Sequence, residues 1–247
     1  MDNKFHGNFT QQDGLPEIAI ERATRVLRSG RLHRYNLGKD EIGEVGSLEL
    51  EFAKFINVKY CLAVASGGYT LSTALRALGV GHGDNVLTNA FTLAPVPGAI
   101  ASVGAKPIFV GVTENLVIDL DDLEAKSQNA KVLMLSHMRG HICDMDKLLS
   151  ICTSNNIQLI EDCAHTMGAK WRDRWSGTDG VIGCYSTQTY KHINSGEGGL
   201  LVTNNPDIMA KATMLSGSYM LYDRHPAGPE KQHYEICLLY TSPSPRD

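Results

Sequence analysis

The hydrophobic positions of the chain form short continuous runs that alternate with segments of helical spacing. Seven runs are mainly apolar and do not alternate in polarity, as strands that are buried on both faces should be. Between them, apolar residues recur at intervals of three and four, as one face of a helix requires. This alternation predicts βαβ units. The predicted strands are YCLAVA (60–65), NVLTNA (85–90), PIFVGV (107–112), KVLMLSH (131–137), IQLIEDC (157–163), VIGCYS (181–186) and GLLVTN (199–204).

These elements predict an α/β fold with three layers, in which a mostly parallel sheet of about seven strands lies between two layers of helices. Helices are also predicted at residues 16–29 and 47–57. With no repeat or linker in between, residues 15–236 are expected to form one domain after an N-terminal arm, 1–14. Residues 237–247, CLLYTSPSPRD, have no periodicity, and we expect a non-native tail there.

The composition narrows the functional class. The 247 residues are 43% hydrophobic, and 23 basic against 27 acidic residues give a formal charge of -4. Because no basic stripe is present, nucleic-acid binding is not expected. The sequence shows no signal peptide and no run of eighteen apolar residues, which predicts a soluble, cytoplasmic protein that does not enter a membrane. The six scattered cysteines are interpreted as reduced core residues.

Open parallel sheets bind ligands beyond the carboxyl ends of their strands, so the residues that follow the apolar runs are candidates for chemistry. In ASGGYTLSTAL a strand ends and a helix begins at Gly67 and Gly68. Backbone N–H groups there, with Ser66 and Thr70, would suit a phosphate, although taken alone the glycines are better explained by a tight strand-to-helix turn.

A second candidate is IQLIEDCAHTMGA, where Glu161 and Asp162 close a strand and His165 follows. A carboxylate at a buried strand end needs a partner, for which Arg172 or Arg174 is available.

A third candidate is the histidine-rich segment LSHMRGH. Its His137 and His141, with Cys143, raise the question of zinc. No second ligand cluster of typical spacing is present, so no metal site is predicted.

The fourth candidate is CYSTQTYK, which places Ser186 at a strand end and Lys191 five residues later. Together the candidates supply a phosphate cradle, a buried acid and a lysine at one sheet edge. Pyridoxal 5'-phosphate needs these three groups, because the lysine binds its aldehyde, the acid keeps its pyridine nitrogen protonated and the cradle holds its phosphate.

At this point the sequence resembles the DegT/StrS type of sugar aminotransferases, within the fold-type-I pyridoxal phosphate enzymes. The resemblance covers most of residues 15–236 and would make them the cofactor-binding large domain. It also implies a small C-terminal domain that is missing here, so that the fragment is expected to be weakly active or inactive. The motifs that carry it are SGGYTLSTAL (66–75), GAKPIFVGV (104–112), HMRGHICDMDKL (137–148), IEDCAHTMGA (160–169), YSTQTYK (185–191) and GEGGLLVTN (196–204).

Carried over by position, the resemblance implies a role for each matched residue. Lys191 would be the catalytic residue and bind the cofactor aldehyde, Asp162 would pair with the pyridine nitrogen, and His165 would lie near the ring hydroxyl. The phosphate would be held by Ser66, Gly67, Gly68 and Ser186, with a contribution from the second subunit of a homodimer.

Two positions depart from the family pattern. Where members usually stack an aromatic residue on the cofactor ring, this chain has Leu93, with Phe91 two residues before it. Many members carry threonine at the position of Gly68, which here leaves only backbone donors.

The activity implied by the resemblance is transfer of an amino group from glutamate or glutamine to a keto-sugar, often nucleotide-linked, in surface-polysaccharide or secondary-metabolite sugar biosynthesis. Arg139, Tyr219 and Arg224 are candidates for substrate contact. A sugar dehydratase is an alternative, although that branch replaces the lysine with histidine, and Lys191 is present here. An inactive cofactor-binding regulator and a plain nucleotide-binding domain are further alternatives.

Overall fold

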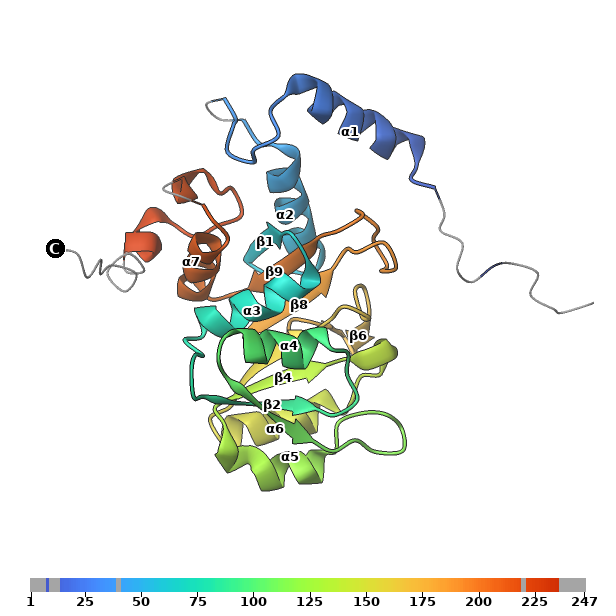
Figure 1. Cartoon of the computed structure of the whole chain (residues 1–247), viewed down its shortest axis with the longest axis vertical. Coiled ribbons are helices and arrows are strands. Elements are labelled where there is room, and N and C mark those ends of the chain that lie inside the picture. The colour runs from blue at the N-terminus through green and yellow to red at the C-terminus, as the bar shows by residue number, and fades with distance from the viewer. Residues whose placement is uncertain (1–7, 9–13, 39–40, 219–220, 236–247) are drawn as a thin grey trace, which may run out of the picture.

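A seven-stranded sheet forms the centre of the molecule (Figure 1). The computed structural model describes residues 8, 14–38, 41–218 and 221–235. Each of the seven predicted runs overlaps one strand, which confirms the predicted fold class. The strand order is β1-β9-β8-β5-β4-β2-β3. The strands are β1 (Tyr60–Val64), β2 (Asn85–Asn89), β3 (Lys106–Val110), β4 (Val132–Ser136), β5 (Gln158–Asp162), β8 (Ile182–Ser186) and β9 (Gly199–Thr203).

One strand runs against its neighbours. The pairs β2–β3, β2–β4, β4–β5 and β5–β8 are parallel, whereas β9 is antiparallel to both β8 and β1. The connection between β8 and β9, residues 187–198, contains no helix. A parallel pairing would need a crossover of a dozen or more residues, usually a helix, so a return in the opposite direction is the economical solution.

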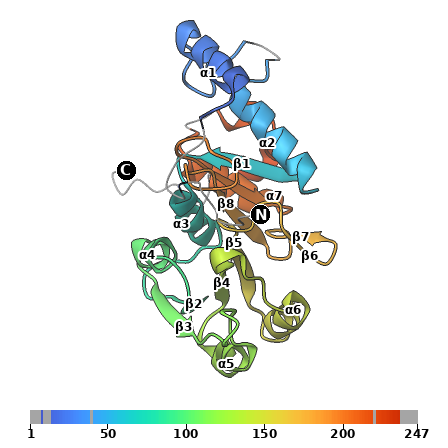
Figure 2. The ribbon, with the colours of Figure 1, turned by 90° about the vertical axis from the view of Figure 1, so that its right-hand side faces the viewer.

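Helices cover both faces of the sheet (Figure 2). Successive side chains of β4 point to opposite faces of the sheet. Met134 belongs to the core under the first helix layer, whereas Leu133 and Leu135 belong to the core under the second. A strand buried in this way is apolar over most of its length. The first layer is α3 (Gly67–Ala77), α4 (Pro95–Ser102) and α7 (Pro206–Leu215), and the second is α2 (Glu44–Phe55), α5 (Leu120–Lys126) and α6 (Met145–Ser154).

Several short elements complete the described chain. A hairpin that the sequence pattern did not predict is formed by β6 (Lys170–Trp171) and β7 (Arg174–Trp175). Single 3-10 turns are η1 (Ser127–Asn129), η2 (Met138–Gly140) and η3 (Tyr222–Arg224). The five cysteines within the described residues are buried and free. None of the described helices is long and apolar enough to cross a membrane.

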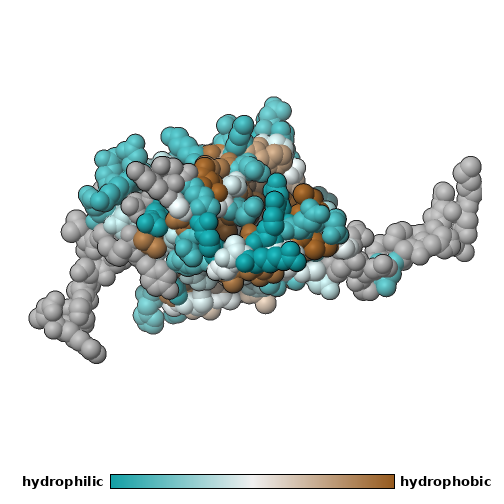
Figure 3. Space-filling view, turned by 90° about the horizontal axis from the view of Figure 1, so that it is seen from above, coloured by the Kyte–Doolittle hydropathy of each residue, from teal (hydrophilic) through white to brown (hydrophobic). Residues whose placement is uncertain are grey.

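The first helix, α1 (Glu17–Ser29), forms as its periodicity predicts but stands away from the sheet (Figure 1). None of its side chains is buried against the described part of the chain. Ile18 is 59% exposed and Leu27 66% exposed. Figure 3 looks onto this end of the molecule and shows brown hydrophobic patches among teal hydrophilic side chains.

A buried ion pair joins the segment after α1 to the sheet. Arg34 Nη2 donates to both oxygens of Glu49, at 2.6 and 2.7 Å, and Glu49 is completely buried on α2. The N–H of Ala63, on β1, donates to the same carboxylate at 2.6 Å. Burial raises the pKa of Glu49 to about 7, against the opposing pull of Arg34. Arg34 is therefore the charge partner that this buried carboxylate requires.

Loss of that partner should destabilise the fold. Arg34→Met is expected to lower the free energy of unfolding by about 3–5 kcal/mol, because the buried Glu49 must then either stay charged without a partner or take up a proton. Arg31→Met is the matched control, since Arg31 pairs with Glu41 but both side chains are about 40% exposed. Urea denaturation of the two variants checks this. Equal stabilities would contradict a dominant role for the buried pair.

Candidate active site

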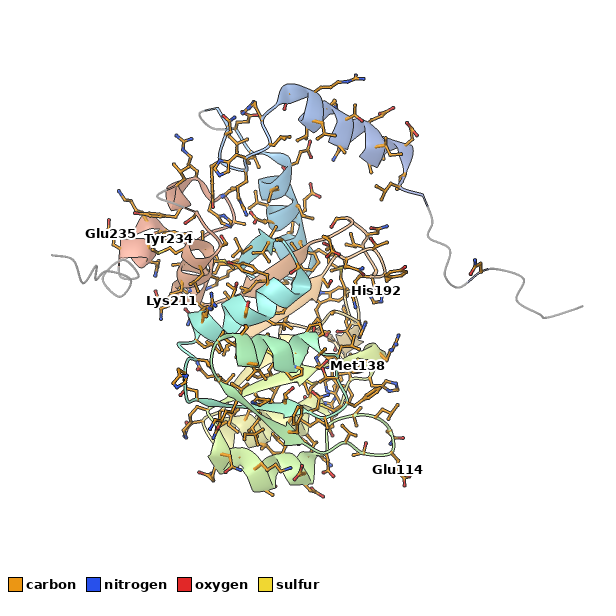
Figure 4. All side chains as sticks on the ribbon, viewed as in Figure 1. Glu114, Met138, His192, Lys211, Tyr234 and Glu235 are labelled. Carbon is orange, nitrogen blue, oxygen red and sulfur yellow. The ribbon has the colours of Figure 1, made fainter. Side chains whose placement is uncertain are left out.

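A small cavity of about 90 Å³ opens where β4, β5 and β8 end. Figure 4 shows Met138 and His192 on this side of the molecule, opposite Lys211 and Tyr234. The lining brings together residues from each of the four candidate segments that follow predicted strands, together with the segment of Leu93. They are Gly67, Gly68, Leu71, Leu93, Pro95, Val96, Ser136, Met138, Asp162, Ala164, His165, Ser186 and Lys191.

The start of α3 presents backbone donors to this cavity. Ser66 caps the helix, because its Oγ accepts the N–H of Tyr69 at 3.1 Å and its carbonyl accepts the N–H of Thr70 at 3.1 Å. No hydrogen bond among the described residues uses the N–H of Gly67 or Gly68. These are the first two helical positions, whose N–H groups and helix dipole favour an anion.

The two glycines differ in the space around them. A Cβ at Gly67 would lie 2.7 Å from Cβ and 3.1 Å from Oγ of Ser186, which is itself buried. A Cβ at Gly68 would meet only Ser66 Oγ, at 3.9 Å. Position 67 therefore requires glycine so that the turn can approach the end of β8, while position 68 has room for a side chain.

Asp162 lies in the cavity at the end of β5, and its carboxylate is held from both sides. Oδ2 accepts the hydroxyl of Ser136 at 3.0 Å, and Oδ1 accepts the N–H of Ala164 at 3.2 Å. Ser136 is in turn fixed by Asn89, which accepts its N–H at 2.8 Å and donates to its carbonyl at 3.1 Å. Sequence reasoning missed Ser136 and Asn89, although both lie next to the last residue of a predicted strand, at the edge where Asp162 lies.

Lys191 reaches the cavity from the connection between β8 and β9. Its Nζ lies 2.8 Å from Nε2 of His165. Burial, together with the charge of Arg139, lowers the pKa of Lys191 against the opposing effect of Asp162. Burial and the nearby Lys191 also lower the pKa of His165. The site therefore makes the neutral amine, which is the nucleophilic form of lysine, easier to reach than it is for an exposed lysine.

The connection that carries Lys191 is tied at both ends. The N–H of Thr187 donates to the carbonyl of Gly198 at 2.9 Å, and the hydroxyls of Thr187 and Ser195 lie 2.7 Å apart. The N–H of Lys191 donates to the carbonyl of Gln188 at 2.8 Å. These bonds fix the base from which the amine extends.

Glu161 points away from the cavity and forms a separate buried hub. His137 Nε2 lies 3.0 Å from its Oε2. Although burial pushes the pKa of Glu161 upward, His137 and the backbone donors hold it below the ordinary value. The carboxylate is thus ionised and saturated with partners. The backbone N–H groups that it accepts belong to Gly177, Asp179 and Gly180, at 2.7 to 2.9 Å.

This hub corrects one expectation. Arg172 and Arg174 do not pair with the carboxylates that end β5; both bind Asp146, and Arg174 also binds Asp179. The donor atoms of His137, Glu161 and Cys163 lie within 4.8 Å of one another, as metal ligands would. Here both Glu161 oxygens are occupied by the hydrogen bonds described above.

Among the remaining candidate residues that the structure describes, only Leu93 belongs to the cavity lining. Leu93 lines the cavity, whereas Phe91 does not and instead accepts the side-chain amide of Asn89 through its carbonyl. The backbone N–H of Arg139 donates to His165 Nδ1 at 3.1 Å. Arg224 donates to the carbonyl of Tyr35 at 3.3 Å, and Tyr219 lies outside the described residues.

Known proteins are similar to this chain in sequence. Residues 16–225 match the model of the DegT/DnrJ/EryC1/StrS aminotransferase family. A putative L-glutamine:3-amino-2,3-dideoxy-scyllo-inosose aminotransferase of Micromonospora echinospora is 41% identical over 180 residues, which cover 71% of this chain and 43% of that protein. GDP-perosamine synthase of Escherichia coli O157:H7 is 35% identical over 182 residues, covering 73% of this chain and 50% of that protein.

Solved structures agree with the sequence relatives. An aminotransferase from Psychrobacter cryohalolentis superposes with a TM-score of 0.78 at 28% identity, covering 97% of this chain and 57% of that one. A 3-amino-5-hydroxybenzoic acid synthase gives 0.76 at 29% identity, covering 91% and 57%. The chain spans about half the length of the curated relatives it matches. It belongs to the DegT/DnrJ/EryC1/StrS aminotransferase family.

Proposed function

We propose that the whole protein is a pyridoxal phosphate-dependent aminotransferase that aminates a ketone on a carbohydrate ring. The observation that carries the proposal is the convergence of Lys191 Nζ, the Asp162 carboxylate and the unpaired N–H groups of Gly67 and Gly68 on one cavity. Membership of an aminotransferase family supports the same conclusion.

The donor set of the cavity fits this cofactor. Gly67 and Gly68 offer N–H groups at a helix start, beside the hydroxyl of Ser186, and would hold the phosphate. Asp162 would hold a protonated ring nitrogen, and its orientation is already set by Ser136 and Ala164. The apolar side chains of Leu93 and Val96 would contact the ring. When bound, the cofactor supplies an electron sink for the substrate's reacting carbon.

Lys191 and His165 would supply the remaining functions. A neutral Lys191 amine can bind the aldehyde and, when released, can take a proton from one carbon and return it to another as general base and acid. His165, at 2.8 Å, orients the amine toward the cavity. Met138 and Leu71 help to exclude water from this side of the cavity.

The substrate class rests on the relatives. Two aminotransferases of Micromonospora echinospora, 41% and 32% identical, are named for L-glutamine as donor and for scyllo-inosose-type acceptors. Perosamine synthases are named for GDP-linked sugars. We therefore propose glutamine or glutamate as donor, a keto-sugar or related cyclic ketone as acceptor, and a homodimer in which the second subunit completes the phosphate site.

Covalent cofactor binding tests the proposal. With pyridoxal phosphate, a naturally extended chain is expected to show a visible absorbance band that borohydride traps on Lys191. The Lys191→Ala variant should lack the band and the trapped adduct, whereas Lys211→Ala, on the opposite side of the molecule, should retain both. Tryptic mass spectrometry locates the adduct. No band in the extended wild-type chain would refute the proposal.

The two glycines give a second, steric test. Gly67→Ala should weaken pyridoxal phosphate binding by at least about tenfold, because its Cβ would overlap Ser186 and move the helix start. Gly68→Ala has open space and should bind within about threefold of wild type. Cofactor titration monitored by absorbance measures both affinities. Equal affinities would mean that the approach of Gly67 to Ser186 does not shape the site.

A regulatory function is a second candidate, because a pleiotropic regulatory protein of Geobacillus stearothermophilus is 31% identical over 219 residues, which cover 86% of this chain and 56% of that protein. Single-turnover transfer from glutamine or glutamate in the extended chain distinguishes the two. Amination of the cofactor supports the enzyme. Cofactor binding without amination supports the regulator.

A further inference from the structure

The backbone of Arg139 has a conformation that its residue type rarely adopts. Its φ is 55° and its ψ is 21°, in the left-handed region where residues other than glycine are uncommon. Such a conformation is unfavourable for a residue with a side chain and persists when surrounding contacts require it. Here it directs the N–H of Arg139 to Nδ1 of His165, at 3.1 Å.

This contact determines which ring nitrogen of His165 carries the proton. A backbone N–H can only donate, so Nδ1 must present its lone pair. In a neutral imidazole the proton is then on Nε2, the nitrogen that lies 2.8 Å from Lys191 Nζ. Because Nε2–H donates, the lysine nitrogen must accept, and only an unprotonated amine has a lone pair with which to do so.

We propose that Arg139 is a positioning residue whose backbone N–H holds His165 in the Nε2–H tautomer, and that His165 thereby keeps Lys191 in the neutral form that can attack an aldehyde. The chain of contacts runs from the Arg139 N–H to Nδ1, and from Nε2–H to Nζ. The inference deepens the proposed function, because it concerns the amine that would bind the cofactor.

The surrounding charges act on the same pair. Arg139, through its guanidinium, and His192 disfavour a further positive charge on His165, while Asp162 favours one. The same two residues act on Lys191, whose pKa is raised by Asp162 and lowered by Arg139. The side chain of Arg139 thus acts in the same direction as its N–H, and the two effects must be separated by experiment.

Removing the backbone N–H of Arg139 while keeping its side chain separates the two effects. Replacing the amide at Arg139 with an ester, by incorporating the α-hydroxy analogue of arginine, deletes the donor and keeps the guanidinium. Nδ1 can then be protonated while Nε2 accepts from an ammonium, so the pKa of Lys191 should rise by about one unit, a tenfold change in protonation. The pH dependence of Lys191 acylation in the cofactor-free 247-residue chain, followed by peptide mass spectrometry, measures this.

The matched control is the same ester at Arg172, another arginine with positive φ, 53°, in the turn of the β6–β7 hairpin. It should leave the Lys191 profile unchanged. In a His165→Gln background there is no tautomer to fix, so the ester at Arg139 should shift the profile by less than about 0.3 unit. An equal shift with and without His165, or no shift in either background, would overturn the proposal.

A measurement on the unmodified chain guards against misfolded variants. ¹⁵N NMR of the His165 ring, above its pKa, should show an unprotonated Nδ1 and a protonated Nε2. The reverse tautomer would overturn the proposal without any substitution. Since neither readout involves the cofactor, failure of covalent cofactor binding in the extended chain would refute the proposed function and leave the tautomer result standing.

Discussion

The end of β5 is the point on which the site depends, because two consecutive carboxylates leave the sheet there in opposite directions. Asp162 enters the cavity and Glu161 enters the second helix layer, as the two-residue period of a strand requires. A buried carboxylate is tolerated only with full hydrogen bonding. Glu161 achieves this with one histidine and three backbone donors, and so fixes the strand end from which Asp162 projects.

The neighbouring strands extend this constraint across the sheet edge. The backbone pairing of β2 with β4 ends at Thr88 and Met134. Beyond it, the side chain of Asn89 bonds both the N–H and the carbonyl of Ser136. Ser136 is thereby held for its hydroxyl to reach Asp162. The orientation of one carboxylate therefore derives from three adjacent strands, and polar side chains replace ladder hydrogen bonds where the strands end.

The sequence predicted the strands and most of the cavity because both follow local rules. Continuous apolar runs identify strands buried on two faces, and the residues after them reach one edge, which brought Gly67, Asp162, His165 and Lys191 together. The reversal of β9 was not predictable from polarity, since a strand buried on both faces has the same composition in either direction. The partners of Glu161 and Glu49 were missed because they come from distant segments, through His137 and Arg34.

Strands and loops differ in rigidity, which explains why Asp162 lies on a strand and Lys191 on a connection. In the proposed function, an acid that would hold one ring atom needs a rigid base, which β5 provides. A lysine that would bind an aldehyde and later move a proton needs reach, which a long side chain on the β8–β9 connection provides. His165 links the two, because it follows β5 and contacts Lys191 at 2.8 Å. The left-handed turn at Arg139 points its N–H at Nδ1 of that imidazole and so fixes the orientation of the ring. In the proposal above, the backbone conformation of one residue thereby determines the protonation state of the Lys191 amine.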